Sequence, residues 1–237
     1  MHFLFEFFNR NRPPISQDHS EWPDEWKRVD FKTYPRLKQV ALPPPELENV
    51  PLKEAILKRK SSRDFSDEPL TLQEISTLLF FGGGLTELAE NMEYSSRRTY
   101  PSGGARYPIE IYFVARNIKD LTPGFYHYNV RAHSLELLGE TDKEDESKFF
   151  HYDFADSAPG VFVFAIIPER STRKYGNFGL KLGLIEAGHI SENIYLISPV
   201  LGIKCCALGG LDEDKAVEAF DLDLEEEIPF YALAVGK

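Results

Sequence analysis

Cysteine is almost absent from this 237-residue sequence, which contains only the neighbours Cys205 and Cys206. Adjacent cysteines rarely form a disulfide, and two thiols alone do not make a zinc-ligand pattern. The scarcity excludes a disulfide-stapled scaffold, and it predicts a reducing, cytoplasmic compartment.

Long apolar runs are also lacking. Residues 1–8 are apolar, but Glu6 interrupts them and no basic stretch comes before them. This segment is too short for a signal peptide or a membrane-spanning helix, and no later segment is long and apolar enough. The sequence therefore predicts that the protein has no membrane partner.

Basic residues are outnumbered, since 27 Lys and Arg against 38 Asp and Glu give a formal net charge of -11. A chain without basic surface to displace counterions is not expected to bind nucleic acid. A local basic pocket for a phosphate-bearing cofactor is still compatible with this balance. The sequence does have 42% hydrophobic and 13% aromatic residues, which is the profile of a soluble globular protein.

The chain divides near its fiftieth residue. Residues 9–51 are rich in proline, tryptophan and charge, show no sustained periodicity, and end in a stiff triple proline at 43–45. We predict that residues 1–50 form an N-terminal arm that packs on the body through aromatic anchors such as Trp22. The composition of the arm favours a non-catalytic strap. Residues 51–237 are predicted to form the main domain.

Hydrophobic periodicity in the main domain switches between helix and strand. A capping box of Thr71 and Glu74 predicts a helix that ends at glycines 82–84. Other helices are predicted from residue 52, over about 180–201, over 212–220, and, as a short helix, after the charged patch 142–148. Strands are predicted at 109–115, 124–128, 134–138, 161–167 and 228–235, with an irregular loop at 85–97 and a glycine-bearing turn at 205–210.

A proline, a hydroxyl and two glycines come shortly before the first of these strands. Pro101, Ser102, Gly103 and Gly104 could let the backbone approach a flat or anionic ligand, with Ser102 able to donate and to accept a hydrogen bond. The same residues also make a good tight turn. By themselves they leave a ligand loop and an ordinary turn evenly balanced.

A basic cluster follows the first predicted helix of the domain. Arg59, Lys60 and Arg63, interleaved with Ser61 and Ser62, could clamp a phosphate, the arginines as bidentate forks and the lysine as a point charge. The alternative is a solvated helix end, where the helix dipole favours cations. Taken alone, the cluster favours the solvated helix end, because charge runs usually lie at the surface.

Lys174 and Tyr175 stand between a predicted strand and the long predicted helix. They could move protons if burial lowered the lysine pKa from its ordinary value of about 10.4. From the residues alone, a solvated loop lysine is the commoner case.

Glu186, His189, Glu192 and Asn193 lie at helical spacing within the long helix. Because the Glu-x-x-His spacing occurs once, the four residues favour a buried structural network over a metal site. We assign no metal.

Several segments taken together resemble a known family. Residues 59–65 and 70–75 look like the opening of the nitroreductase-like FMN flavoproteins. Within that superfamily, several segments resemble the SagB-type dehydrogenases, which form thiazoles and oxazoles. These segments are residues 98–111, 123–128, 174–176, 186–193, 207–210 and 231–236. The similarity runs in order over roughly residues 50–237, so it is far more specific than any single motif.

The resemblance implies an α+β nitroreductase-like fold, with a central mixed, mostly antiparallel sheet flanked by helices. It also implies an intertwined homodimer with FMN at the dimer interface. Many nitroreductases place further basic residues after the last strand, whereas this sequence ends at Lys237. Phosphate binding would then lean on the basic cluster, with a contribution from Lys237.

Individual residues take roles by this resemblance. The phosphate and ribityl chain would be held by Arg59, Lys60, Ser61 and Arg63. The flavin ring would be lined, from the partner chain, by Pro101, Ser102, Gly103 and Gly104. Its reactive side would face Leu208, Gly209 and Gly210. The catalytic pair would be Lys174 and Tyr175.

Three functions are compatible with these expectations. The first is an FMN-dependent oxidoreductase of SagB type that transfers a hydride between flavin N5 and a substrate, as in the oxidation of an azoline to an azole. The second is an NAD(P)H-dependent nitro- or quinone reductase. The third is a flavin-free scaffold subunit of a modification complex. The sequence does not distinguish a small-molecule from a peptide substrate.

Overall fold

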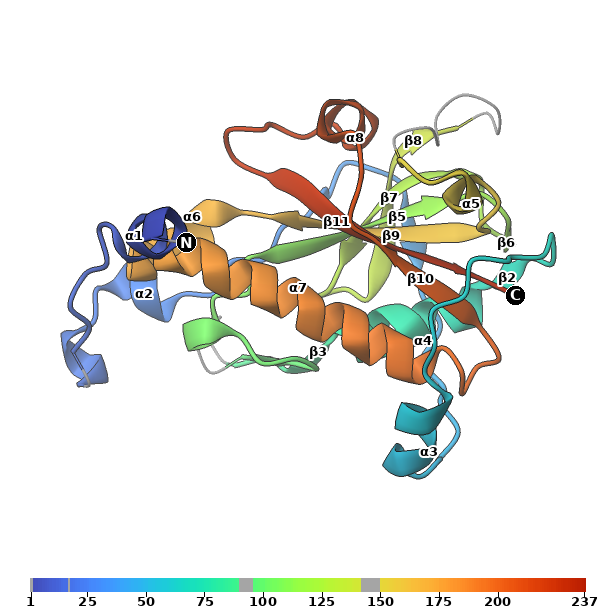
Figure 1. Ribbon diagram of the computed structural model, residues 1–237, viewed down its shortest axis with the longest axis horizontal. Helices are drawn as coiled ribbons and strands as arrows, with labels where there is room; N and C mark the ends of the chain where they lie inside the picture. The colour runs from blue at the N-terminus through green and yellow to red at the C-terminus, as the bar shows by residue number, and fades with distance from the viewer. Residues whose placement is uncertain (1, 17, 90–95, 142–149) are drawn as a thin grey trace.

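A seven-stranded sheet forms the centre of the molecule in a computed structural model, which describes residues 2–16, 18–89, 96–141 and 150–237 (Figure 1). The strand order is β1-β8-β7-β5-β9-β11-β10, and each neighbouring pair is antiparallel. The strands are β1 (Gln39–Ala41), β5 (Ile109–Ala115), β7 (Gly124–Asn129), β8 (Ser134–Glu140), β9 (Gly160–Ile166), β10 (Lys204–Leu208) and β11 (Ile228–Gly236).

Two short strand pairs lie outside this sheet. The strands β2 (Leu70–Thr71) and β6 (Ile118–Lys119) pair in parallel, and β3 (Leu85–Glu87) pairs antiparallel with β4 (Arg97–Arg98). Residues 85–97 were predicted as an irregular loop, so β3 and β4 correct that prediction in its described part. The predicted charged patch 142–148 lies outside the described residues.

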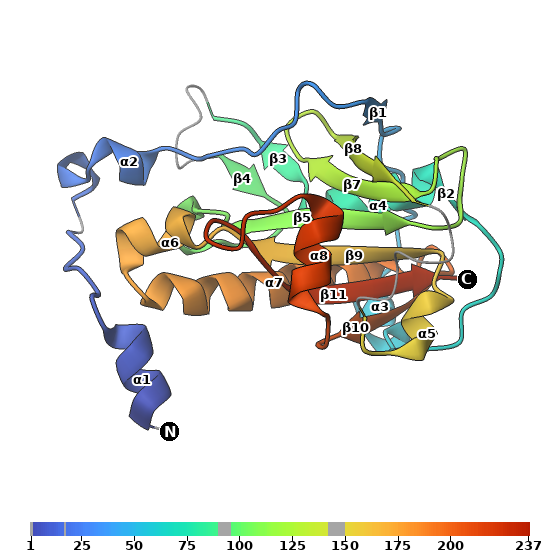
Figure 2. The same ribbon diagram turned by 90° about the horizontal axis from the view of Figure 1, so that it is seen from above.

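The central strands β5 and β9 are buried along their whole length, as their unbroken apolar sequences require. Side chains on β5 alternate between two cores, with Phe113 on one face and Tyr112 and Val114 on the other. The helices α4 (Leu72–Gly83) and α7 (Phe178–Ile197) cover the first face, and α5 (Asp153–Asp156) and α8 (Glu213–Phe220) cover the second (Figure 2).

The helix α4 begins at the predicted capping box. The Thr71 hydroxyl accepts a hydrogen bond from the Glu74 backbone N–H at 3.2 Å, and the Glu74 carboxylate accepts one from the Thr71 N–H at 2.8 Å. The helix ends at glycines that allow close packing: a Cβ added at Gly82 would lie 2.7 Å from Ile194 of α7. The predicted start of α4 is therefore confirmed, and its glycines let α7 approach.

The remaining described helices are α1 (His2–Asn9), η1 (His19–Glu21), α2 (Asp24–Lys27), α3 (Leu52–Lys58), η3 (Gly103–Ala105) and α6 (Pro168–Tyr175). The described residues of the N-terminal segment run past α6, and Gln39–Ala41 then join the sheet edge as β1 (Figures 1 and 2). No helix in the described part of the chain is long and apolar enough to cross a membrane.

The prediction of a turn at 205–210 was wrong for residues 205–208. Residues 204–208 form the edge strand β10, in which Cys206 is opposite Ala234 of β11. Cys205, Cys206 and Leu208 are buried, so packing against β11 and the helix layers holds this short segment extended. A five-residue edge strand followed by two glycines is too short to show period-2 alternation.

Candidate functional site

The loop at Pro101–Gly104 is fixed by one carboxylate of α7. Glu186, which is 2% exposed, accepts hydrogen bonds at Oε1 from the Ser102 hydroxyl at 2.9 Å and from the Gly103 N–H at 3.0 Å. The Ser102 oxygen in turn accepts a hydrogen bond from the Tyr107 N–H at 2.9 Å. Ser102 thus uses both its donor and its acceptor to tie the loop to the helix.

Gly104 brings this loop against Lys174 and Tyr175. Its φ of +63° lies in the left-handed region, and a Cβ added there would be 2.4 Å from the Tyr175 hydroxyl and 3.1 Å from the Lys174 amine. Both the backbone conformation and the lack of space therefore require glycine. The glycine loop and the predicted catalytic pair form one group of residues.

Lys174 lies in the helix α6, so the alternative of a solvated loop lysine is wrong. The side chain is 1% exposed, and its amine makes no hydrogen bond to any described residue. Burial, with the nearby positive charge of Arg106, lowers the pKa of Lys174 to about 8. The lowered pKa leaves a minor but appreciable fraction of the amine neutral near physiological pH, whereas an ordinary lysine would be almost fully protonated, and this neutral form is the one that a general base requires.

Arg106 and Tyr175 complete the surroundings of the amine. The Arg106 guanidinium donates to the Gly104 carbonyl at 3.1 Å and also to backbone carbonyls of the arm. Burial raises the pKa of Tyr175, although the Arg106 charge acts in the opposite direction. The phenol therefore keeps its proton at neutral pH and can act as a hydrogen-bond donor.

Glu186 is itself perturbed. Burial raises its pKa to about 7, although the hydrogen bonds from Gly103 and Ser102 favour the charged form. Its second oxygen, Oε2, has no hydrogen-bond partner among the described residues. The carboxylate that anchors the loop thus titrates in the physiological range.

The basic cluster lies against β10 at the other half of α7. Ser61 forms a parallel bridge with Cys205, and the Ser62 N–H donates to the Cys205 carbonyl at 2.9 Å. The Ser61 hydroxyl is 3.0 Å from the Tyr195 hydroxyl, which accepts a hydrogen bond from the Ala207 N–H at 2.7 Å. The cluster is therefore fixed to both the sheet edge and the helix.

The three cations of the cluster fit a phosphate. Arg59, Lys60 and Arg63 are exposed, and none of them pairs with a carboxylate of a described residue. The adjacent Asp64 pairs with Lys204 at 3.1 Å instead. A phosphate dianion could therefore be neutralised here without breaking an existing ion pair. Lys237 is less available, because it forms an ion pair with Glu74.

Leu208 ends the edge strand β10, and Gly209 and Gly210 follow directly after it. Leu208 is buried, while a Cβ added at Gly209 would meet no atom within 4 Å. Cys205, beside Ser61, is three residues before Leu208, which corresponds to about 10 Å along a strand. One extended ligand could reach from the basic cluster to the open backbone at Gly209.

These two groups of residues do not meet within one chain. The glycine loop is bonded to α7 at Glu186 and the basic cluster at Tyr195, nine residues later, or about 14 Å along the helix axis. Within the described ranges, no hydrogen bond joins one group to the other. A complete site would therefore need a second copy or an extended ligand.

The predicted network on α7 forms only in part. Asn193 donates to the carbonyls of Gly82 and Thr99, both at 3.3 Å, and so ties α7 to the end of α4 and to the residue that follows β4. His189 and Glu192 are exposed, so including them in a buried network was wrong.

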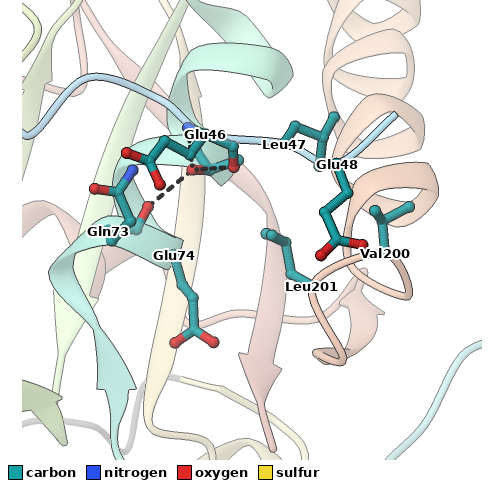
Figure 3. Close-up of a pocket in the computed structure, with 8 residues that line it drawn as sticks. Glu46, Leu47, Glu48, Gln73, Glu74, Val200 and Leu201 are labelled. Atoms are coloured by element: carbon teal, nitrogen blue, oxygen red, sulfur yellow. Dashed lines mark hydrogen bonds between the residues drawn. The ribbon is translucent and has the colours of Figure 1, made fainter. Parts of the chain in front are cut away.

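A surface pocket of about 480 Å³ is lined by residues that are not among the predicted catalytic and cofactor-binding residues (Figure 3). Its walls carry the carboxylates of Glu46, Glu48 and Glu74. An acidic lining disfavours a phosphate-bearing ligand, so this pocket is not the candidate site.

Sequence reasoning missed Arg106 and also the contacts that Trp22 and Trp26 of the arm make with Arg173 and Lys174 of α6. Arg106 stands within the glycine-loop motif, which was the signal available for it. The tryptophans were recognised as anchors, but contacts across some 150 residues of sequence leave no periodic pattern.

The architecture, an antiparallel sheet covered by helices on both faces, is shared with known proteins. Residues 56–237 match the profile of the nitroreductase family. The chain is 31% identical over 195 residues to MJ1384 of Methanocaldococcus jannaschii, which carries a nitroreductase name; the match covers 81% of this chain and 94% of MJ1384. The chain belongs to the nitroreductase family, a family of flavin-type oxidoreductases.

Other similar proteins take part in microcin production. The chain is 28% identical over 155 residues to the microcin B17-processing protein McbC of Escherichia coli, over 60% of this chain and 55% of McbC. A chain in the E. coli microcin synthetase McbBCD complex with truncated pro-MccB17 bound has the same fold, with a TM-score of 0.64 at 19% identity, covering 100% of this chain and 91% of that one. The predicted resemblance and fold class are confirmed.

Proposed function

We propose that the protein is an FMN-dependent oxidoreductase resembling the SagB-type dehydrogenases, acting on an azoline-type ring of a small molecule or peptide. The observation that carries the proposal is the buried, unpaired amine of Lys174 beside Tyr175 and the glycine loop. The similarity to the microcin B17-processing protein McbC supports this class of substrate.

The residues present fit FMN. Arg59, Lys60, Ser61 and Arg63 would hold the phosphate and ribityl chain, since the three cations lack carboxylate partners among the described residues. Leu208, Gly209 and Gly210 would face the reactive side of the ring, where the Gly209 backbone is open. When bound, FMN supplies an acceptor for a hydride.

Lys174 and Tyr175 would handle the proton. Oxidation of an azoline to an azole removes one hydride and one proton and leaves a new double bond in the ring. The neutral amine of Lys174 would take the proton and become an ammonium. Tyr175, which keeps its own proton, would donate a hydrogen bond that orients the substrate.

We also propose a homodimer. Apolar side chains on α3 and α7 are between 46% and 74% exposed, namely Leu52, Ile56, Leu57, Leu184 and Ile185. Covering them with a second copy would remove this surface from water. A dimer would also let the Pro101–Gly104 loop of one protomer approach the basic cluster of its partner.

We propose the same domain division and cellular compartment that the sequence predicts. Residues 51–237 would be the FMN-binding domain and residues 1–50 the arm on its surface. The protein would be cytoplasmic, with neither nucleic acid nor membrane among its partners.

The substitution Lys174→Ala tests the proposal. We expect normal FMN content and a fall of about 10²–10⁴-fold in substrate oxidation, measured as bleaching of the flavin absorbance in a single turnover with an azoline substrate. Lys181→Ala, at an exposed position of α7, is the matched control. Undiminished turnover in Lys174→Ala would exclude Lys174 as the base.

Two other observations would favour the alternative functions. Bleaching of the bound flavin by NAD(P)H alone would favour a nitro- or quinone reductase. A colourless protein that cannot take up FMN would favour a scaffold subunit.

A further inference from the structure

The N-terminal arm covers the Lys174 amine with aromatic rings. The Lys174 nitrogen lies 3.2 Å from the centroid of the Trp22 ring and 5.8 Å from that of Trp26. The two indoles pack edge to face, with centroids 6.4 Å apart. Because the amine is 1% exposed, the arm takes the place that water would otherwise occupy around it.

Several hydrogen bonds fix the arm in this position. The Trp26 indole N–H donates to the Arg173 carbonyl at 3.0 Å, beside Lys174 in the same helix. Arg106 donates to the carbonyls of Glu25 at 3.1 Å and Arg28 at 2.8 Å. The Trp22 indole N–H donates to the Ser16 carbonyl at 2.8 Å. The Trp22 indole is therefore fixed by its own hydrogen bond and by the hydrogen bonds that tie the following residues of the arm to α6 and to Arg106.

The charges around the amine do not favour its protonated form. Arg106, which faces it from the glycine loop, is positive, and Tyr175 of α6 is a neutral phenol. The negative charge of Glu186 in α7 helps to raise the pKa of Tyr175, and its carboxylate accepts a hydrogen bond from the Gly103 N–H. No carboxylate of a described residue contacts the Lys174 amine. The indole face attracts an ammonium by about 0.5–2 kcal/mol, but it also excludes the water that would solvate the charge.

We propose that Trp22 is a positioning residue for Lys174, whose indole forms the outer wall of the site and keeps the amine dry and directed at Gly104 and Tyr175. The arm would then complete the site, in contrast to the non-catalytic strap that its composition predicts. The inference rests on the proposed role of Lys174 as the base. Its test reads the amine itself, without flavin or substrate.

The test is the pH dependence of chemical labelling of Lys174. The full-length wild type and Trp22→Ala are treated with trace acetic anhydride over a pH series, and each lysine is quantified by peptide mass spectrometry relative to exposed Lys181. Asp24→Asn, at an exposed position of the same arm, is the matched control. The phenylalanine variant Trp22→Phe keeps a ring over the amine, and circular dichroism checks that each variant is folded.

We expect the wild type to label slowly at Lys174, with a midpoint near the lowered pKa of about 8. In Trp22→Ala the plateau rate should rise and the midpoint should move up towards about 10.4, since water can then solvate the ammonium. Trp22→Phe should lie between the two, and Asp24→Asn should match the wild type. An unchanged plateau and midpoint in folded Trp22→Ala, or a Lys174 as reactive as Lys181 in the wild type, would overturn the inference. If labelling behaves as expected but Lys174→Ala still turns over, the proposed function fails while the shielding stands.

Discussion

Buried polar groups with few partners characterise the candidate site at the level of single residues. The Lys174 amine and Glu186 Oε2 both lack hydrogen-bond partners among the described residues, and both groups have pKa values shifted towards neutrality. Burial is the main cause of both shifts. Such residues are costly to keep in a core, which is the expected signature of a functional site.

Glu186 gives a prediction about pH. Its pKa is raised in the folded protein, so the stability associated with its neutral form is present below about pH 4.5 and is lost as pH rises through about 7. In Glu186→Gln the amide oxygen can still accept the bonds from Ser102 and Gly103, and this loss should disappear. The measurement is the free energy of unfolding from pH 4 to 8, compared with the wild type.

Glu192→Gln, at an exposed position of the same helix, should leave the pH profile of the wild type unchanged. Equal slopes for the wild type and Glu186→Gln would show that the buried carboxylate does not titrate in this window.

Gly104 gives a prediction about strain. An alanine there would have to adopt a φ of +63° and would clash with the Tyr175 hydroxyl, so we expect Gly104→Ala to destabilise the fold by about 1–3 kcal/mol. Gly188→Ala is the control: it is an exposed helical position where an added Cβ meets nothing within 4 Å, and it should stabilise the fold by up to about 1 kcal/mol. Urea denaturation measures both, and a neutral Gly104→Ala would contradict the geometry of the loop.

Among the elements, the ones that could be predicted from the sequence are those whose own residues carry a clear local pattern. The strands β5 and β9 are apolar throughout because both faces are buried, and α4 begins at a complete capping box. The strands β1, β3, β4 and β10 are short and are held by their partners, so their own residues show no alternation. The turn predicted at 205–210 failed for this reason.

The capping box also gives a prediction for a single element. Thr71→Ala removes the oxygen that accepts from the Glu74 N–H, and it should lower the free energy of unfolding by about 0.5–2 kcal/mol. Thr71→Ser keeps that oxygen and should retain most of the stability in thermal or chemical denaturation. If both substitutions had the same effect, the hydroxyl would not be the cause.

On the scale of the whole molecule, the candidate site joins parts of the chain that are far apart in sequence. Trp22 of the arm, Gly104 of the loop and Lys174 of α6 converge on one amine. The sequence identified Lys174 and Gly104 through their resemblance to a family motif. It could not reveal that Trp22 covers them, because that contact depends on the path of the arm over the folded domain.

The proposed dimer gives a prediction at the same scale. Leu57→Asp places a charge on the exposed apolar face of α3, so we expect a monomer in light-scattering chromatography and weaker FMN binding with an intact fold. Leu224→Asp alters an apolar side chain that is also exposed but lies outside α3 and α7, and it should leave the dimer intact. A wild type that is monomeric at all accessible concentrations would exclude the dimer.

The central proposal is that the chain binds FMN through Arg59, Lys60, Ser61 and Arg63. Its most direct test is a titration of the purified, flavin-stripped protein with FMN, followed by the visible absorbance of the bound flavin. We predict saturation at one FMN per chain, with an affinity at least about tenfold weaker in the double variant Arg59→Ala/Arg63→Ala, because two charge-assisted contacts to the phosphate are lost. A folded wild type that binds no FMN, or a double variant that binds it as tightly as the wild type, would contradict the proposal.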